Sequence, residues 1–324
     1  MSKKVTWGWT GMSHDASLAV FVGDKFRWAR RTQQYTNIVN DKTLCLPLIK
    51  DALQFGKPSQ VYFYEQPWLK KTRQLYAGQY TLLSKESPTR YMRRLWKDAP
   101  KSTTVSHHLS HAAAGYYTSS FDNAAVLVMD SIGEWNTITI WEGDGTELTR
   151  KFVQNYPHSI GIWYSAMTQR VGLQPQTQEH IISEMAQVGN SDRFYQLIKT
   201  EFIMKMPDIN DPRLLFKRNC HRGCRDWRPE LNTVQDLTDI AAATQRIFAE
   251  IVDLLIVCSL KLTCSKNIVL MGGCSMNSVC RESANKYFDN TWIMPSPGDA
   301  SSALGCVLAH TKTKIRLRKK IWSE

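Results

Sequence analysis

The sequence predicts an α/β fold made of two similar lobes, each with a mixed sheet flanked by helices. Three observations lead to this prediction. The chain has 324 residues, 43% of them hydrophobic, which is enough to bury a large core. A pattern of three alternating, strand-like segments occurs near the start of the chain, and a similar pattern occurs again after residue 120. Each pattern is followed by a segment with helical periodicity.

The first pattern consists of two strands around a polar loop, a Gly23-Asp24 turn and a third strand. The polar loop carries His14 and Asp15. We expect strands over residues 5–10, 17–22 and 25–30, then a helix over residues 46–55 and a strand over residues 61–64.

The second pattern has the same order. An apolar run ends at Asp130, and the loop after it contains Gly133 and Glu134. A Gly272-Gly273 turn, which would let backbone amides approach a ligand, opens another helix further along the chain. We expect strands over residues 124–130, 136–141, 147–153, 267–271 and 291–294, and helices over residues 160–171 and 237–262.

Actin-like and sugar-kinase-like folds are built from one unit that occurs twice. The unit consists of a strand, an acidic loop, a strand, a Gly-Asp turn, a strand and a helix. Such folds bind their ligand between the two halves. We therefore assign residues 1–120 to a first lobe, residues 121–310 to a second lobe and residues 311–324 to a basic tail.

Three of the eight histidines lie within five residues, at His107, His108 and His111. On a helix, His107 and His111 share a face and can point two imidazoles at one ion, whereas His108 faces elsewhere. Asp130, at the carboxyl end of its strand, could add an oxygen ligand. The same histidine spacing also occurs by chance on many helices, so the pattern alone leaves a metal centre and a structural role both open.

The formal net charge of +12 indicates an anionic partner, because a basic field attracts phosphates. Positive charge is concentrated in residues 68–97, where cations alternate with aromatic side chains, and in residues 312–320. Such segments are commonly solvated surface, and they also occur in nucleic-acid-binding proteins. A nucleotide or a phosphorylated small molecule would satisfy the same charge.

No apolar stretch reaches the length of about 20 residues that a membrane span requires, and the N-terminus leads directly into a strand-like segment. We therefore expect a cytoplasmic protein without a membrane partner. The eight cysteines are scattered along the chain, which favours reduced thiols over a disulfide framework.

Seven segments, in order along the chain, resemble the O-carbamoyltransferase family typified by nodulation-factor, cephamycin and tobramycin carbamoyltransferases. They include His-His-Leu-Ser-His-Ala-Ala-Ala at residues 107–114 and Gly-Gly-Cys-Ser-Met-Asn at residues 272–277. The others are residues 13–20, 128–135, 157–164, 239–245 and 297–305. The resemblance implies the actin-like fold that the family shares with tRNA threonylcarbamoyl transferases, in agreement with the repeated strand pattern.

The resemblance also implies a set of site residues. A divalent ion, most readily Fe²⁺ with Mn²⁺ or Zn²⁺ as alternatives, would be bound by His107, His111, Asp130 and Asp299. His14 would be the catalytic base that takes the proton of the acceptor hydroxyl, with Asp15 beside it. An imidazole with a pKa near neutrality suits that role. The adenylate part of an activated donor would contact Gly133, Glu134, Gly161, Glu179, Gly272, Gly273 and Asn277.

The implied activity is metal-dependent transfer of a carbamoyl group from carbamoyl adenylate, or from carbamoyl phosphate, to an acceptor hydroxyl. Family members usually carry a further domain that makes carbamoyl adenylate from ATP and carbamoyl phosphate. This chain continues for 25 residues after Asp299, so we expect a separate adenylate-forming protein, direct use of carbamoyl phosphate or loss of the activity.

Two departures from the family pattern concern the pockets. Ala29-Arg30-Arg31 stands where the family has Glu-Glu-Arg, and Ile181 stands where it has a lysine. The added positive charge suits an anionic acceptor, such as a nucleotide or a hydroxylated base in nucleic acid. Two alternatives stay open. One is a subunit that transfers a threonylcarbamoyl-type group to tRNA or a nucleotide, and the other is a nucleotide-binding protein without catalysis.

Overall fold

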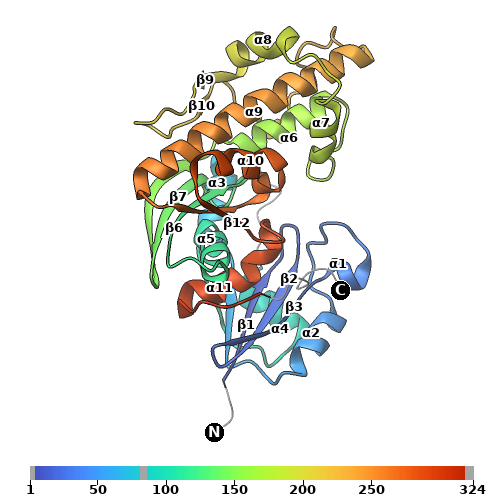
Figure 1. The fold of residues 1–324 in the computed structure, drawn as a ribbon. Helices are drawn as coiled ribbons and strands as arrows, with labels where there is room; N and C mark the ends of the chain where they lie inside the picture. The colour runs from blue at the N-terminus through green and yellow to red at the C-terminus, as the bar shows by residue number, and fades with distance from the viewer. Residues whose placement is uncertain (1–3, 81–85, 318–324) are drawn as a thin grey trace.

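Two five-stranded sheets form the framework of the protein (Figure 1). The computed structural model describes residues 4–80 and 86–317. The first sheet contains β1 (Val5–Thr10), β2 (Ser17–Val22), β3 (Lys25–Arg31), β4 (Gln60–Phe63) and β5 (Ser102–Thr104). The second contains β6 (Asn123–Met129), β7 (Asn136–Asp144), β8 (Glu147–Asn155), β11 (Asn267–Met271) and β12 (Asn290–Ile293). A separate two-stranded sheet contains β9 (Ile203–Lys205) and β10 (Leu215–Phe216).

The two large sheets have the same topology. Their strand orders are β3-β2-β1-β4-β5 and β8-β7-β6-β11-β12. In each sheet the first three strands pair antiparallel, and the last two strands add in parallel beside the first. The repeat that the sequence predicts is therefore present in the chain's topology, and the predicted α/β class with two mixed sheets is confirmed.

Two helices lie between the sheets, α5 (His107–Thr118) and α11 (Ser302–Thr311) (Figure 1). Although α5 follows the last strand of the first sheet, it packs against β6 and β11 of the second sheet. Conversely, α11 follows the last strand of the second sheet and packs against β1. The helices cross closely at Gly305, where an added Cβ would lie 1.8 Å from the Ser110 carbonyl oxygen. This central layer brings the two lobes together.

The outer faces of both sheets are covered by further helices. Alternate side chains of β6 point into two separate cores, one shared with α5 and α11 and the other with the helices of the second lobe. Burial on both faces explains why β6 is a continuous apolar run. The remaining helices are α1 (Gln33–Thr36), α2 (Leu46–Leu53), α3 (Pro67–Tyr76), α4 (Pro88–Leu95), α6 (Ile160–Arg170), α7 (Glu179–Met185), α8 (Asp192–Phe202), α9 (Val234–Thr263) and α10 (Ser278–Tyr287).

The element boundaries differ from the sequence prediction at two informative places. Helix α9 begins at Val234, three residues before the predicted start at residue 237, because Thr233 and Asp236 form a capping box. The helix expected directly after the Gly272-Gly273 turn begins only at Ser278, since a 3-10 turn over Gly273–Met276 comes first. Capping side chains, which an apolar pattern does not count, set both starts.

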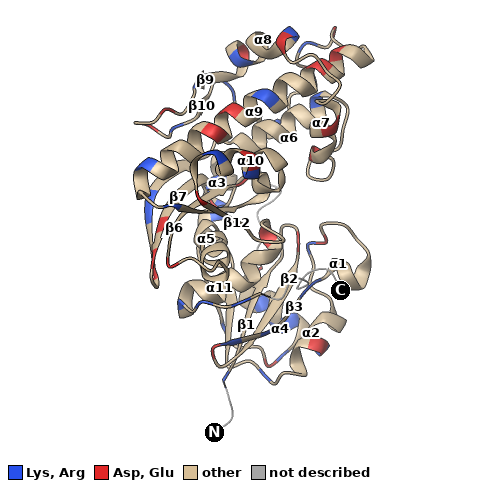
Figure 2. Cartoon of the chain, in the orientation of Figure 1, with Lys and Arg blue, Asp and Glu red and all other residues tan. Residues whose placement is uncertain are grey.

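The described part of the predicted basic tail is attached to the body of the protein. The Lys312 ammonium lies 2.6 Å from a carboxylate oxygen of Glu147, and the Lys314 ammonium donates to the Tyr116 carbonyl at 3.0 Å, at the end of α5. Residues 318–320 of this segment, and residues 81–85 of the basic segment 68–97, lie outside the described residues. Lys and Arg occur on both lobes among acidic residues (Figure 2).

Within residues 4–80 and 86–317, no helix combines the length and the apolar character that crossing a membrane requires. All eight cysteines are free thiols, as the sequence predicts.

Candidate metal centre

His107 and His111 occupy the first turns of α5, and both side chains are buried. Ser106 precedes the helix but its side chain makes no capping hydrogen bond. The carboxylate of Glu134 does so instead, accepting from the His107 backbone N–H at 3.0 Å. With this turn fixed, the two imidazoles lie on one face of the helix with their Nε2 atoms 3.1 Å apart.

Two buried carboxylates complete the group. Asp130 follows the last residue of β6, and its Oδ2 lies 3.2 Å from Nε2 of His107. Asp299 lies at the start of a 3-10 turn before α11, and its Oδ1 lies 3.2 Å from Nε2 of His111. The crossing of α5 and α11 thus brings Asp299 to the histidines, 188 residues away in the sequence from His111.

The spacing of these four ligand atoms fits a single divalent ion. All four lie within 4.8 Å of one another, and neighbouring pairs are separated by 3.1 to 3.4 Å. Metal–ligand bonds of ~2.1 Å place adjacent ligands roughly 3.0 Å apart in an octahedral site and roughly 3.4 Å apart in a tetrahedral one. Two imidazole nitrogens at 3.1 Å cannot both carry a proton toward each other without repulsion, whereas one cation between them satisfies both.

Electrostatics within the group also favour a cation. Burial raises the pKa of the Asp130 carboxyl, but the hydrogen bond to His107 and the nearby imidazoles outweigh burial and lower it. The pKa of Asp299 is likewise lowered, since the charges of His14 and His107 outweigh the cost of its burial. Burial lowers the pKa of His107, but Asp299 and Asp130 together raise it well above its ordinary value. Two ionised carboxylates in a buried site attract protons to the imidazoles when no metal ion replaces them.

His108 has a different environment, as the sequence predicts. Its Nδ1 lies 2.9 Å from the Thr139 hydroxyl, which accepts a hydrogen bond from the Trp141 indole at 2.8 Å. Nε2 of the same ring is buried and has no hydrogen-bond partner among the described residues. Burial, with the charge of His107, lowers the pKa of His108 to about 3. His108 is therefore neutral and buried, and it contacts Thr139 of β7 rather than the other two histidines' ligand atoms.

His14 lies in the loop between β1 and β2, on the other side of Asp299. Its Nε2 is 3.4 Å from Asp299 Oδ2, and its Nδ1 is 3.3 Å from Asp15 Oδ2. The residues Met12 and Asp15 on either side have positive φ angles of 69° and 50°, a backbone conformation that non-glycine residues seldom adopt. Hydrogen bonds from Met12 N–H to the Lys42 carbonyl and from the Thr10 hydroxyl to the Asp15 carbonyl fix this shape.

The His14 side chain is 46% exposed, in contrast to the four buried ligands. The charge of Asp299 raises the pKa of His14 to about 9, against the opposing effect of burial and with further support from Asp15. This value differs from the neutral pKa expected for a catalytic base. It applies to the site with both Asp299 oxygens free of a metal ion.

Five of the seven predicted donor-binding residues lie around Asp130. A Cβ on Gly133 would lie 3.1 Å from the His107 side chain, and a Cβ on Gly161 would lie 2.8 Å from the Ser131 backbone. Gly272 has a φ of +89°, and a Cβ there would lie 2.2 Å from the Met129 carbonyl oxygen. The Gly273 N–H lies 3.3 Å from Asp130 Oδ1. Close packing therefore explains why several of these positions are glycine, independently of any role in donor binding.

Glu134 is buried, and its Oε1 accepts from the backbone N–H groups of both Gln66 and His107, at 2.8 and 3.0 Å. Burial raises the pKa of its carboxyl. The structure thus places Glu134 at the N-termini of α3 and α5, a role that the sequence pattern did not reveal.

Glu179 and Asn277 belong to a neighbouring polar group on the second lobe. Glu179 accepts from the Ser165 hydroxyl at 2.7 Å, and Asn277 accepts from the Gln245 amide at 3.0 Å. Burial raises the thiol pKa of Cys274, which precedes Asn277 in the chain, and the charges of Asp130 and Glu179 add to this effect. The predicted donor-binding residues therefore fall into two sets, one around Asp130 and one with partners on α6 and α9.

Sequence reasoning missed three residues beside the site. The Lys70 ammonium lies 2.8 Å from Glu65 Oε2 and contacts the Ser13 hydroxyl, directly before His14. Glu65 follows the end of β4 and is buried. The signal available in the sequence was an acidic residue after a buried parallel strand, because such strand ends meet at one edge of the sheet.

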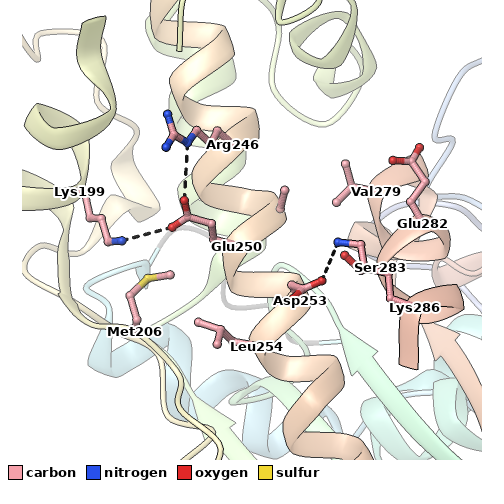
Figure 3. A pocket seen from close by; sticks show the side chains of 11 residues that line it. Lys199, Met206, Arg246, Glu250, Asp253, Leu254, Val279, Glu282, Ser283 and Lys286 are labelled. Carbon is pink, nitrogen blue, oxygen red and sulfur yellow. Dashed lines mark hydrogen bonds and ion pairs between the residues drawn. The ribbon is translucent and has the colours of Figure 1, made fainter. Parts of the chain in front are cut away.

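Away from this group, a hollow of about 690 Å³ lies between α8, α9 and α10 (Figure 3). Its cations are paired, Lys199 with Glu250 at 3.2 Å and Lys286 with Asp253 at 3.0 Å. Of the residues that the structure describes, only His107, His111, Asp130 and Asp299 form a group with metal-ligand spacing. The metal centre between the lobes is therefore the stronger candidate site.

Comparison with known proteins agrees with this geometry. The family model described as "Carbamoyltransferase N-terminus" matches residues 69–308. The nodulation protein NolNO of Sinorhizobium fredii is 26% identical over 244 residues, which cover 69% of this chain and 34% of that protein. The uncharacterized protein sll1178 of Synechocystis is 33% identical over 228 residues, covering 66% of this chain and 37% of that protein. The chain thus spans a little over a third of the length of these relatives.

A solved structure of full-length HypF, described as its phosphate- and nucleotide-bound form, superposes with a TM-score of 0.53 at 13% identity. The superposition covers 99% of this chain and 57% of that protein. The likeness extends to the fold alone, and the predicted duplicated actin-like architecture is confirmed.

Proposed function

Since this chain belongs to the family of the carbamoyltransferase N-terminal domain, we propose that it transfers a carbamoyl group to an acceptor hydroxyl at the metal centre between its lobes. One observation carries the proposal. Four buried ligand atoms converge within 4.8 Å, and a half-exposed imidazole lies 3.4 Å from one of the ligating carboxylates. Ligands on one side and a solvent-accessible base on the other suit a reaction between a bound carbonyl and an incoming hydroxyl.

The donor set of two imidazoles and two carboxylates suits Fe²⁺ first, with Mn²⁺ or Zn²⁺ as alternatives. Such an ion would polarise the carbonyl of the carbamoyl group. In the proposal His107 and His111 use their Nε2 atoms. Their Nδ1 atoms have no hydrogen-bond partner within the described residues, so helix packing is left to orient the rings.

His14 would accept the proton of the acceptor hydroxyl at Nε2. The acceptor oxygen then forms a bond to the carbamoyl carbon, and the bond from that carbon to the phosphate oxygen of the donor breaks. To accept a proton His14 must be neutral, whereas the charge of Asp299 raises its pKa to about 9. When Asp299 serves as a metal ligand, its charge no longer holds that proton as strongly. Asp15 at Nδ1 would orient the ring and stabilise its charged form.

We propose carbamoyl adenylate as the donor, supplied by an adenylate-forming protein, with carbamoyl phosphate as the direct alternative. Its adenylate part would lie on the second lobe beside Gly133, Gly161, Gly272, Glu179 and Asn277. The proximity of the glycine loops to Asp130 supports this placement, because the carbonyl must reach the metal ligands while the nucleotide extends away. The net charge of +12 supports an anionic acceptor, and a nucleotide or a nucleic-acid base is the class that we propose.

The test is a transfer assay with purified protein, Fe²⁺ or Mn²⁺, and a panel of nucleosides, nucleotides, oligonucleotides and sugars. The donor is carbamoyl phosphate with ATP in one series and preformed carbamoyl adenylate in another. Transfer adds about 43 Da to the acceptor, the net mass of a carbamoyl group that replaces hydrogen in acyl transfer.

We expect the mass gain to disappear in His111→Ala and to persist in His180→Gln, which alters an exposed histidine of α7. A gain only with preformed carbamoyl adenylate would identify that molecule as the donor. A protein that binds metal but transfers nothing from either donor would contradict the proposal and favour a nucleotide-binding protein.

A further inference from the structure

Helix α3 (Pro67–Tyr76) makes hydrogen bonds to both lobes beside the candidate site. On the first lobe, its Lys70 contacts Ser13 and Glu65. Toward the second lobe, Arg73 Nε donates to the Glu134 carbonyl at 3.0 Å. Because Glu134 also caps the helix that bears the metal-ligating histidines, a ligand resting on α3 would lie next to the reaction centre.

The outward face of α3 is unusually apolar for a solvent-facing surface. Trp68 is 65% exposed, Tyr76 is 70% exposed and Leu75 is 47% exposed. With the exposed Thr72 they fall at positions i, i+4, i+7 and i+8, which lie on one face of a helix. Scattered surface aromatics are ordinary, but an aromatic stripe of about 12 Å along one helix indicates a binding surface.

The second lobe extends this surface. The Trp135 ring lies 5.5 Å from the Tyr76 ring, centre to centre, and its indole N–H donates to the Thr72 hydroxyl at 3.1 Å. Trp135 ends the same loop that contains Asp130 and Glu134. The aromatic stripe therefore leads from the outside of α3 to the loop that supplies a metal ligand.

Two cations border the stripe. Lys71 is adjacent to it on the helix. The Arg222 guanidinium lies beside Gly78, two residues after Tyr76, and is 3.9 Å from the position that a Cβ on Gly78 would occupy. Neither cation forms an ion pair with a carboxylate of the described residues. By contrast, the cations Lys199 and Lys286, which line the hollow between α8, α9 and α10, are each paired with a carboxylate (Figure 3). Cations without acidic partners beside aromatic rings favour a ligand that offers both negative charge and flat rings.

We infer that the α3 surface, defined as Trp68, Lys71, Thr72, Tyr76 and Trp135, binds single-stranded nucleic acid and guides one of its nucleotides to the metal centre. This inference rests on the proposed transfer function and specifies its acceptor as a polymer. Bases stack on exposed aromatic rings while the phosphates meet the bordering cations. A stripe of about 12 Å accommodates roughly three bases at a rise of ~3.4 Å each.

The charge of the α3 surface favours single-stranded nucleic acid over an oligosaccharide as its ligand. A sugar chain also stacks on aromatic rings, but a neutral sugar makes no use of Lys71 and Arg222 or of a chain with a net charge of +12. Base stacking with backbone neutralisation uses both features of the surface. The reactive hydroxyl of a nucleotide must also leave a duplex before it can enter a site between two lobes, which favours a single strand.

The experiment is a fluorescence anisotropy titration of the full chain with labelled DNA and RNA strands of about twelve nucleotides, a common site size. We expect Trp68→Ala and Tyr76→Ala each to weaken binding about tenfold, the loss typical of one stacked base. Lys71→Gln should reduce the salt dependence of log K by about 0.7, the value for one phosphate contact on a single strand. Tyr287→Ala at the end of α10 and Lys25→Gln at the start of β3 are the matched aromatic and charge controls, and both should bind as the unaltered protein does.

Equal binding by the Trp68 and Tyr76 variants and the unaltered protein would overturn the inference. So would an oligosaccharide that binds more tightly than either strand, or a dimer that the Trp68 substitution dissociates in sedimentation. The proposed function is tested separately, because anisotropy requires no transfer. Transfer of a carbamoyl group to sugars, without binding of either strand, would support the proposed function and refute the inference about the α3 surface. Strand binding that depends on α3, without transfer to any acceptor, would support the surface and contradict the proposed function.

Discussion

Equivalent loops of the two lobes differ in their exposure and in what their acidic residues contact. The loop after β1 and the loop after β6 each have six residues, residues 11–16 and 130–135, and each joins the first two strands of its sheet. Aligned by position, His14 corresponds to Gly133 and Asp15 corresponds to Glu134. Both loops reach the candidate metal centre, yet the Asp15 side chain is 22% exposed while Glu134 is buried.

The difference follows from what each acid contacts. Asp15 faces the His14 ring at 3.3 Å, so its loop presents a titratable pair to solvent. Glu134 accepts from two helix N-termini, and the glycine before it allows the His107 side chain to approach. In the proposed function, the duplicated fold thus supplies one loop for proton transfer and one for holding the ligand residues in place. If this division is correct, substitutions in the two loops have separable effects.

The largest expected effect is that of Asp130→Asn in the second loop. Removing this charge should abolish both metal binding and transfer, because a neutral amide is a weak ligand for a divalent ion and leaves the two histidines with one carboxylate. Metal content after dialysis, measured by atomic emission, should fall to background. Asp144→Asn on β7 changes an exposed aspartate of the same lobe and should retain the metal.

The next effect is that of His14→Gln in the first loop. We expect transfer to fall by about 10²- to 10⁴-fold, the usual contribution of a general base, with metal content unchanged. Single-turnover assays with preformed donor give this rate directly. Loss of the metal from this variant would contradict the division between the loops, since His14 would then act as a ligand.

Parts of this site follow from the sequence alone. The spacing of His107 and His111 predicts that they share a helix face, and the apolar run before Asp130 predicts a strand end. Asp299 was found only by resemblance, because its position depends on how α11 crosses α5, and no local pattern encodes that crossing. The close crossing of α5 and α11 is possible because Gly305 has no side chain that would clash with the Ser110 carbonyl oxygen.

The fold shows the same limit. The repeated strand pattern predicted the topology, since alternation and turns are local properties. Strand β5 was missed because Ser102–Thr104 is too short to show a period. The cap formed by Glu134 was also missed, because it joins segments that become neighbours only after both lobes fold. Local chemistry is therefore predictable, and cross-lobe contacts are not.

A smaller effect is expected for Glu134→Ala. The buried N–H groups of Gln66 and His107 would lose their acceptor, which should lower the free energy of unfolding by about 1–3 kcal/mol. Urea denaturation of the metal-free protein measures this change. Asp15→Ala, at the equivalent position of the first loop, should cost less because its carboxylate is partly solvated. Equal losses would argue against distinct roles for the two acids.

The smallest effect is the contribution of the first loop to the pH dependence of the metal-free protein, in addition to that of the buried His107, whose pKa is also raised. The pKa of His14 is raised from 6.5 to about 9 by Asp299. A raised pKa in the folded state contributes stability that is fully present below about pH 6.5 and is lost as pH rises through about 9. The melting temperature should therefore decline across this interval, and His14→Gln should flatten the decline. Solvent around the half-exposed ring screens the attraction, so the change should be modest. Saturating metal should remove it as well, because Asp299 is then engaged as a ligand. A decline of equal size in His14→Gln would place the responsible group outside the first loop.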